Sequence, residues 1–147
     1  QVISGKGRNR SISDVEYEIY DTRMKVNLLQ PLKANGGELT VVDISLNNLA
    51  HSFYAAQNLE YNLNAVYGDA IDHIGPGYDI YYLDGSNDPQ ETLDQYVKIE
   101  NESAIVLVDD FKIKGTLLQS YLSEKETYYN HYNVANEVIL INNLKRD

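Results

Sequence analysis

Acidic residues and glycine follow four short apolar runs of this chain. A carboxylate accepts hydrogen bonds from hydroxyl groups and also binds hard divalent cations. If the apolar runs are parallel strands, their carboxyl ends meet at one edge of the sheet, where α/β proteins bind ligands. The sequence therefore predicts a ligand site made of strand ends. Each apolar run is followed by these residues: Asp43 follows run 39–42, Gly68-Asp69-Ala70 follow run 63–67, Asp84-Gly85 follow run 78–83, and Asp109-Asp110 follow run 104–108.

Two chemistries suit these acids. Asp43 follows a strand and precedes a helix, where a carboxylate can accept hydrogen bonds from ribose hydroxyls or can simply favour the helix N-terminus. Asp84, Asp109 and Asp110 end neighbouring strands and would repel one another unless a cation lies between them. Mg²⁺ or Ca²⁺ is the natural partner of such an all-oxygen set. The competing interpretation is that one of these acids caps the next helix while another points to solvent.

Helices are expected between the strands. Ser45 can cap a helix with apolar residues at helical spacing. Asp88 is a suitable N-cap, followed by Pro89 and by Glu91 at the position of a capping box. Residues 115–122 form a further amphipathic segment. The apolar residues after Ser45 are Leu46, Leu49, Ala50, Phe53 and Ala56.

The order of elements predicts an α/β fold in a single domain, residues 1–147, with a mostly parallel sheet and helices on both faces. Only Ala135-Asn136 separates the strand-like segments 127–134 and 137–142, so this carboxyl-terminal pair should be antiparallel. At the amino end, a very short strand is expected at residues 2–4, running into the turn Gly5-Lys6-Gly7. Residues 12–34 have roughly helical apolar spacing, interrupted at Pro31.

Composition narrows the function. The chain has 147 residues, of which 43% are hydrophobic and none is cysteine, and its formal charge is −10. The negative charge disfavours nucleic acid and anionic membranes as partners. The lack of cysteine excludes disulfides, thiolate metal sites and a cysteine nucleophile. Neither a signal peptide nor a membrane span is visible, so a cytoplasmic location is expected.

The motifs Val41-Val-Asp43, Tyr67-Gly-Asp69-Ala, Tyr82-Leu-Asp84-Gly and Leu107-Val-Asp109-Asp110 resemble the class I S-adenosylmethionine-dependent methyltransferases, and most closely their catechol O-methyltransferase-like small-molecule group. The resemblance implies a Rossmann-like fold and O-methyl transfer to a small hydroxylated acceptor, assisted by a divalent cation. It assigns cofactor binding to Gly5, Gly7, Asp43, Ile44, Gly68, Asp69, Ala70 and Asp84. It assigns the metal to Asp84, Asp109 and Asp110, and catalysis to Asp84, Asp109 and Lys112.

The sequence departs from this family in two places. Ser4-Gly5-Lys6-Gly7 is the candidate glycine-rich loop, but it lies unusually far from Asp43 and lacks a preceding acid. Ser86-Asn87 stands where the family often has a Lys or His, and Asn cannot serve as a base near neutral pH. The metal could then acidify the acceptor, or Lys112 or Lys114 could reach the site.

Two other functions remain open. One is a catalytically inactive methyltransferase-like subunit for binding or assembly. The other is a polyamine-synthase-like aminopropyltransferase, which the segment from Leu83 to Pro89 faintly resembles. The expected partner is a small-molecule acceptor, and a homo-oligomer is compatible with the sequence. The three histidines have no metal-ligand spacing and are interpreted as surface or hydrogen-bonded residues; they are His51, His73 and His131.

Overall fold

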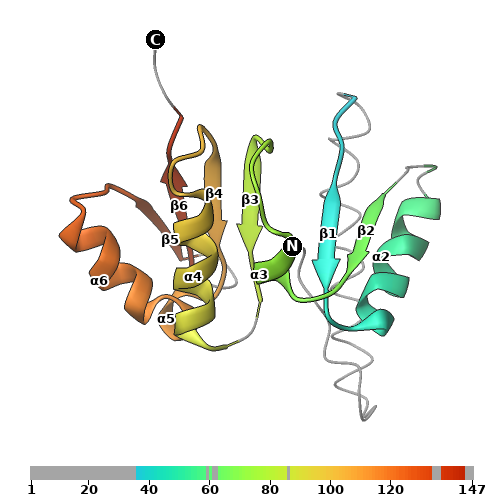
Figure 1. Cartoon of the computed structure of the whole chain (residues 1–147), viewed down its shortest axis with the longest axis horizontal. Helices are drawn as coiled ribbons and strands as arrows, with labels where there is room; N and C mark the ends of the chain where they lie inside the picture. The colour runs from blue at the N-terminus through green and yellow to red at the C-terminus, as the bar shows by residue number, and fades with distance from the viewer. Residues whose placement is uncertain (1–35, 59, 61–62, 86, 134–136, 145–147) are drawn as a thin grey trace. The chain divides into compact units, whose positions relative to one another are not determined.

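A computed structural model describes residues 36–58, 60, 63–85, 87–133 and 137–144 of the chain. The chain divides into two compact units, Gln1–His73 and Ile74–Asp147, and the described strands of each unit form a separate sheet (Figure 1). The predicted strand at residues 2–4, the glycine turn and the helical pattern of residues 12–34 lie outside the described residues. Among the residues described, no helix is long and apolar enough to cross a membrane.

The first unit contains a parallel pair of strands joined by a helix. Strands β1 (Thr40–Asp43) and β2 (Asn64–Tyr67) pair in parallel, as predicted, and helix α2 (Leu46–Asn58) connects them. A short helix, α3 (Ala70–His73), follows β2. Of the predicted apolar face of α2, Leu49 and Ala56 are buried, whereas Leu46, Ala50 and Phe53 are exposed. The other buried residues of the helix are Asn48, Ser52 and Ala55, so its buried face is displaced from the predicted one.

The second unit contains a four-stranded mixed sheet in the order β3-β4-β6-β5. β3 and β4 are parallel, while β6 runs antiparallel to both β4 and β5. This arrangement confirms the predicted antiparallel carboxyl-terminal pair. The elements are β3 (Ile80–Leu83), α4 (Pro89–Ile99), β4 (Ile105–Val108), α5 (Phe111–Lys114), α6 (Thr116–Glu124), β5 (Asn130–Asn133) and β6 (Glu137–Asn142).

The start of α4 follows the predicted capping chemistry. The Asp88 side chain accepts a hydrogen bond from the backbone N–H of Gln90 at 3.0 Å, and Pro89 is the first helical residue. Strand β3, in contrast, starts two residues later than the predicted strand 78–83. The Tyr81 hydroxyl donates to the carbonyl of Gly75 at 2.6 Å, which ties the preceding turn to the strand.

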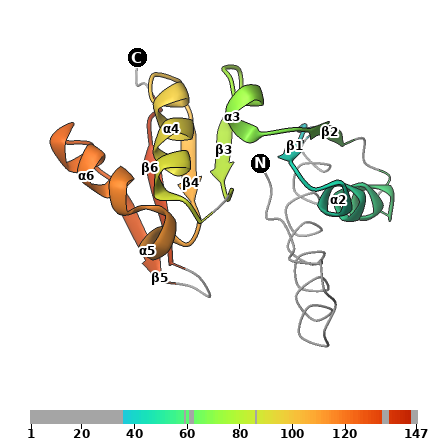
Figure 2. The ribbon, with the colours of Figure 1, turned by 60° about the horizontal axis from the view of Figure 1, so that its bottom comes forward.

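The core of the second unit lies between its sheet and its helices. Alternate strand residues point to this core, as the two-residue period of a strand requires. Figure 1 shows α4 in front of β4, and Figure 2 follows the chain from β4 through α5 into α6. The core residues that are completely buried are Ile99, Ala104, Val106, Val108, Leu118, Leu122, Ile139 and Ile141.

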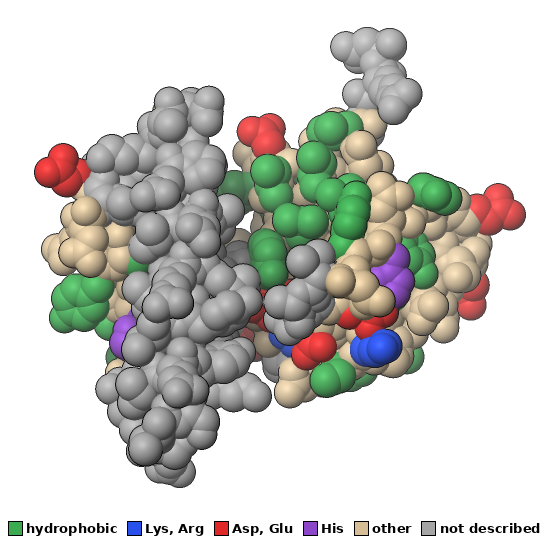
Figure 3. Space-filling model, turned by 180° about the vertical axis from the view of Figure 1, so that it is seen from behind, with side chains coloured by type: hydrophobic (Ala, Val, Ile, Leu, Met, Phe, Trp, Pro, Cys, Tyr) green, Lys and Arg blue, Asp and Glu red, His purple; other side chains and the backbone are tan. Residues whose placement is uncertain are grey.

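The other face of this sheet is also apolar. Figure 3 shows hydrophobic side chains gathered on it. Tyr82, Ile105 and Leu107 are half-buried there, and Ile80 is 57% exposed. Apolar side chains on both faces are typical of strands in α/β proteins.

Candidate functional site

Asp43 ends β1 beside the turn that follows β2. The parallel register pairs Asp43 with Tyr67, and the N–H of Gly68 donates to the Asp43 carbonyl at 3.0 Å. The two strands therefore end at one edge, as the sequence predicted for this pair. The side chain of Asp43 is nearly buried, and its Oδ1 accepts the N–H of Ser45 at 2.8 Å.

The other predicted cofactor residues of the first unit lie at the same edge. Ile44 is 65% exposed directly after β1. After β2, Asp69 is exposed and its Oδ1 accepts the N–H of Ile71 at 3.3 Å, while Ala70 is buried at the start of α3. The edge thus presents an apolar side chain and a carboxylate next to a buried strand-end acid. The glycine residues Gly5 and Gly7, predicted to contact the same cofactor, lie outside the described residues.

Gly68 lies close to the side chain of His73. A Cβ atom at this position would lie 2.5 Å from Nε2 of His73. A larger residue would therefore require the imidazole to move away.

Asp84 and Asp109 end the two parallel strands of the second unit. Leu83 pairs with Val108, and the N–H of Asp109 donates to the Leu83 carbonyl at 3.2 Å. Only 5% of Asp84 and 4% of Asp109 is exposed. Two carboxylates are thereby placed side by side in a region that solvent hardly reaches, and each needs a partner.

Lys114 provides a partner for Asp84. Its Nζ lies 2.5 Å from Asp84 Oδ1, and both side chains are nearly buried. The buried acid at the end of β3 and the buried lysine of α5 thus form an internal ion pair. From the sequence, Lys114 was only one of two lysines that could reach the site.

The local fold between β4 and α6 brings Lys114 to this position. Asp110 adopts a left-handed conformation with φ of 52°, which turns the chain from β4 into α5. The N–H of Lys114 donates to the Asp110 carbonyl at 3.0 Å. At Gly115 a Cβ atom would fall 1.9 Å from the Phe111 ring, so only glycine allows this turn to close on the buried Phe111.

Burial raises the pKa of Asp84 to about 7. Lys114 opposes the shift by stabilising the charged carboxylate, and the neighbouring Asp109 carboxylate adds to it by repulsion. Asp109 contributes a second unusual feature, because its Oδ1 is buried and has no hydrogen-bond partner. The strand ends of this unit therefore hold two buried acids and one buried ammonium group.

This arrangement differs from the predicted metal site at Asp84, Asp109 and Asp110. The three acids were expected to surround a divalent cation, but Asp84 is already in contact with the Lys114 ammonium. In the described part of the chain, no group of three or more His, Cys, Asp or Glu residues could hold a metal ion. The residues do not fit a Mg²⁺ or Ca²⁺ centre as arranged here, because a positive charge lies where the cation would have to bind.

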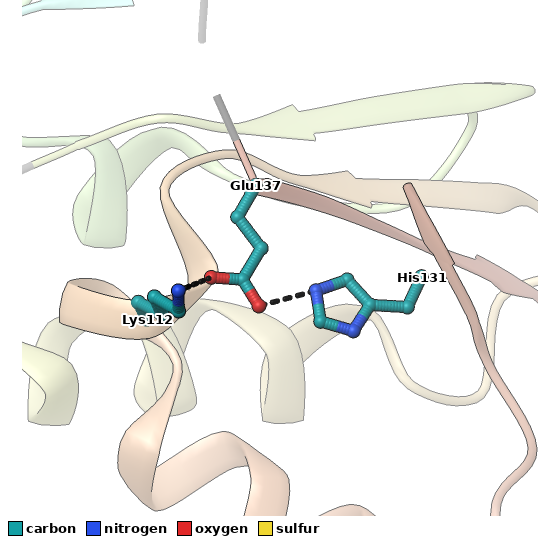
Figure 4. A network of polar contacts seen from close by, with 3 residues as sticks. All are labelled: Lys112, His131 and Glu137. Carbon is teal, nitrogen blue, oxygen red and sulfur yellow. Dashed lines mark ion pairs between the residues drawn. The ribbon is translucent and has the colours of Figure 1, made fainter. Parts of the chain in front are cut away.

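Lys112, the lysine predicted to be catalytic, lies elsewhere. Its side chain is 80% exposed, and its Nζ is 3.8 Å from Oε2 of Glu137 on β6. Glu137 Oε1 also contacts Nε2 of His131 on β5 (Figure 4). His131 is thus an ion-paired or hydrogen-bonded residue, as the sequence predicted. Glu137 was not singled out in the sequence, since an acid at the start of a strand carries no signal of its partner.

Comparisons with known proteins identify the fold of the chain. No protein-family model and no curated protein sequence matches the chain. The chain is similar in structure to a methyltransferase from Geobacter sulfurreducens, with a TM-score of 0.57 and 16% identity over 74% of this chain and 59% of that chain. It therefore spans less than two thirds of the length of that protein.

Two further structures extend this similarity. A suggested caffeoyl-CoA O-methyltransferase from Staphylococcus aureus has a TM-score of 0.56 and 12% identity over 91% of this chain and 93% of that chain. A suggested rRNA methylase from Clostridium thermocellum has a TM-score of 0.54 and 12% identity over 76% of this chain and 75% of that chain. At such identities only the fold follows. The chain has the Rossmann-like α/β fold that these methyltransferase structures share, with an antiparallel carboxyl-terminal strand pair.

Proposed function

We propose that this protein is an S-adenosylmethionine-dependent methyltransferase that acts on the hydroxyl group of a small acceptor. The observation that carries the proposal is the edge of the first unit, where the parallel register brings Asp43 next to the turn at Gly68 and Asp69. In a nucleotide-binding sheet this is the position of the acid that binds ribose. The shared fold supports the same reaction class.

The residues at this edge fit the adenosine part of the cofactor. Asp43 would accept hydrogen bonds from the ribose hydroxyls, because the two oxygens of a carboxylate can accept more bonds than the one that Oδ1 accepts from Ser45. Ile44 would offer an apolar contact to the adenine, and Asp69 would accept from its amino group. When bound, the cofactor would supply a methyl group on a sulfonium for transfer to the acceptor oxygen.

The choice of a small hydroxylated acceptor has its own support. The formal charge of −10 disfavours binding to the phosphates of RNA, which a methylase of rRNA must contact. One similar structure, matched over 91% of this chain, carries the name of a caffeoyl-CoA O-methyltransferase. Metal assistance is left out of the proposal, since Lys114 is in contact with Asp84.

Cofactor binding tests the proposal first. Calorimetric titration with S-adenosylmethionine and S-adenosylhomocysteine should give one site, and Asp43→Asn should weaken it by roughly tenfold or more, through loss of charged hydrogen bonds to ribose. The Asn side chain can still accept from Ser45, so folding is preserved. Asp72→Asn, which removes an exposed acid from α3 of the same unit, should leave affinity unchanged.

A methyl-transfer assay then identifies the class of acceptor. With cofactor carrying a radioactive methyl group, phenolic and sugar acceptors should become labelled, and rRNA should not. Labelling of rRNA alone would refute the acceptor class but keep the reaction. If the folded protein does not bind the cofactor, the proposed enzymatic activity is refuted, and a role as a binding or assembly subunit is favoured. Binding of the decarboxylated cofactor in preference to S-adenosylmethionine would favour an aminopropyltransferase.

A further inference from the structure

We infer that the face of the second unit's sheet turned away from its core binds a neutral monosaccharide unit, at the start of β5 and the end of β6. The site is a hollow of about 210 Å³. The inference concerns the second unit alone and does not depend on the proposed methyl transfer. The residues that line the hollow are Tyr128, Tyr129, Asn130, Leu140, Asn142 and Leu144.

The strand register determines the floor of the hollow. Asn130 of β5 pairs with Leu140 of β6, and Asn142 lies two residues further along β6. These three side chains lie on one face of the sheet, because a strand has a two-residue period. Ile139 and Ile141 belong to the core, so the hollow is on the other face. Leu140 thus provides an apolar floor, with one amide across the strand pair and another along the strand.

Two tyrosines supply aromatic surface beside this floor. Tyr128 is 84% exposed, so most of its ring is open to a ligand. Tyr129 is half-buried, and its ring lies edge-on to buried Phe111 with the ring centroids 5.7 Å apart. This contact ties the segment before β5 to the core. The C–H groups of a sugar ring carry a small positive charge and pack well against the negative face of an aromatic ring.

The two asparagines supply polar contacts. Oδ1 of Asn142 accepts the N–H of Leu144 at 3.0 Å, which orients the amide and leaves its NH₂ group to donate to a ligand. Asn130 is exposed and offers both a donor and an acceptor. Sugar hydroxyls also donate and accept, so hydroxyls on one ring can match both amides. A phenol has a single hydroxyl and would leave one amide without a ligand partner.

Size and charge restrict the ligand further. A volume of about 210 Å³ is below the roughly 300–1,000 Å³ of pockets that take drug-sized ligands, so the hollow has room for one ring. None of the lining residues carries a charge, and the formal charge of the chain is −10. An anionic sugar phosphate is therefore disfavoured, and a neutral sugar is favoured.

The hollow lies at the opposite end of the sheet from the strand-end acids. Asn142 pairs with Ile105, the first residue of β4, whereas Asp109 directly follows the last. The length of β4 separates them by on the order of 10 Å. A sugar bound in the hollow therefore occupies a site distinct from the ion pair of Asp84 and Lys114.

Titration of the full chain with methyl β-D-glucopyranoside and methyl β-D-galactopyranoside, followed by NMR of the backbone amides, tests the inference. At least one glycoside should shift the signals of Asn130, Asn142 and Leu144 saturably, with the roughly millimolar affinity expected for one ring. Tyr128→Ala should weaken binding at least about fivefold, whereas Tyr128→Phe keeps the ring and should bind within about twofold of wild type. Tyr54→Ala, the matched control, removes an exposed ring from α2 of the first unit and should leave binding unchanged.

Three results would overturn the inference. One is the absence of these shifts with both glycosides at tens of millimolar. Another is glycoside binding that Tyr128→Ala does not weaken. The third is phenol that saturates the same signals more tightly than either glycoside, because the hollow would then be a site for an aromatic ring. Tyr128 is highly exposed, so its variants should fold, and Asn130→Ala, at another exposed residue, should also weaken glycoside binding.

Discussion

Asp43 in the first unit and Asp84 in the second stand at equivalent places, each at the carboxyl end of a parallel strand. Both are nearly buried, with 6% and 5% exposed. Asp43 Oδ1 accepts a hydrogen bond from the N–H of Ser45, two residues later. Asp84 Oδ1 contacts Lys114, thirty residues later, at the end of a different helix. The same residue type at the same kind of position is thus satisfied in two different ways.

The difference lies in what each contact requires. The hydrogen bond from Ser45 to Asp43 forms within the local backbone turn at the start of α2, so this bond depends little on the rest of the fold. The Asp84 contact requires that β3, β4 and α5 are all in place. A buried ion pair is costly to break because the remaining charge loses its partner without regaining water. The second unit should therefore depend far more on its strand-end acid than the first.

The largest expected effect follows from Lys114→Met. Methionine keeps most of the side-chain volume and removes the charge, so Asp84 loses its buried partner. At about pH 8 we expect the free energy of unfolding to fall by about 3 kcal/mol. Denaturation by urea measures the change. Asp84→Asn combined with Lys114→Met should recover at least half of the loss, since both charges are then absent; a double variant as unstable as the single one would contradict the ion pair.

The pH dependence of stability should reveal Asp84. Its pKa is raised from 3.8 to about 7 on folding, so the native state holds a proton that the unfolded state releases. The contribution of Asp84 to the free energy of unfolding is therefore present at low pH and is lost as pH rises from about 4 to 7. This loss is at most on the order of 4 kcal/mol. The Asp84→Asn variant should show a flatter stability profile across this window. Asp79→Asn, at an exposed acid just before β3, should retain the wild-type slope.

Asp43→Ala should have a smaller effect than either change. The loss of the local hydrogen bond to the N–H of Ser45 should lower the free energy of unfolding by about 1 kcal/mol. Asp43→Asn keeps an oxygen for that bond and should lose less. If Asp43→Asn destabilises the protein as much as Lys114→Met does, the contrast between local and distant partners is wrong.

Asp88→Ala should have the smallest effect. Asp88 caps α4 through the N–H of Gln90, a local contact at an exposed position within the second unit. Loss of a cap costs about 0.5–1 kcal/mol, and Asn restores it. Thermal unfolding of the two variants measures this difference. If Asp88→Ala destabilises the protein as much as Lys114→Met does, the loss of stability depends on which unit carries the residue. It would then not depend on whether the lost contact is local or distant in sequence.

Much of the fold could be predicted from the sequence because its signals are local. The apolar runs that end at Asp43 and Asp84 are strands, and Asp88-Pro89 does start a helix. The short separation that the sequence indicated at Ala135-Asn136 predicted the antiparallel pair that β5 and β6 form. The short helix α5 was not predicted, since four residues contain too little periodicity to signal a helix.

The candidate site was predictable in part. Strand ends could be read from the sequence, so Asp43, Asp84 and Asp109 were identified as candidates, and the parallel registers bring the neighbouring strand ends of each unit together. The partner of each acid was harder to foresee. Lys112 and Lys114 are two residues apart and differ little as sequence, yet one is 80% exposed and the other is nearly buried.

The sequence by itself therefore determined the type and order of the elements and the acids that end the strands, because propensity, capping and hydrophobic period act over a few residues. Only the tertiary structure decided that Asp84 contacts an ammonium rather than joining a metal centre. That choice depends on the left-handed turn at Asp110 and on the packing of Phe111 against Gly115, which together direct Lys114 inward. Burial then makes the charge of this one lysine decisive, because water is not there to replace it.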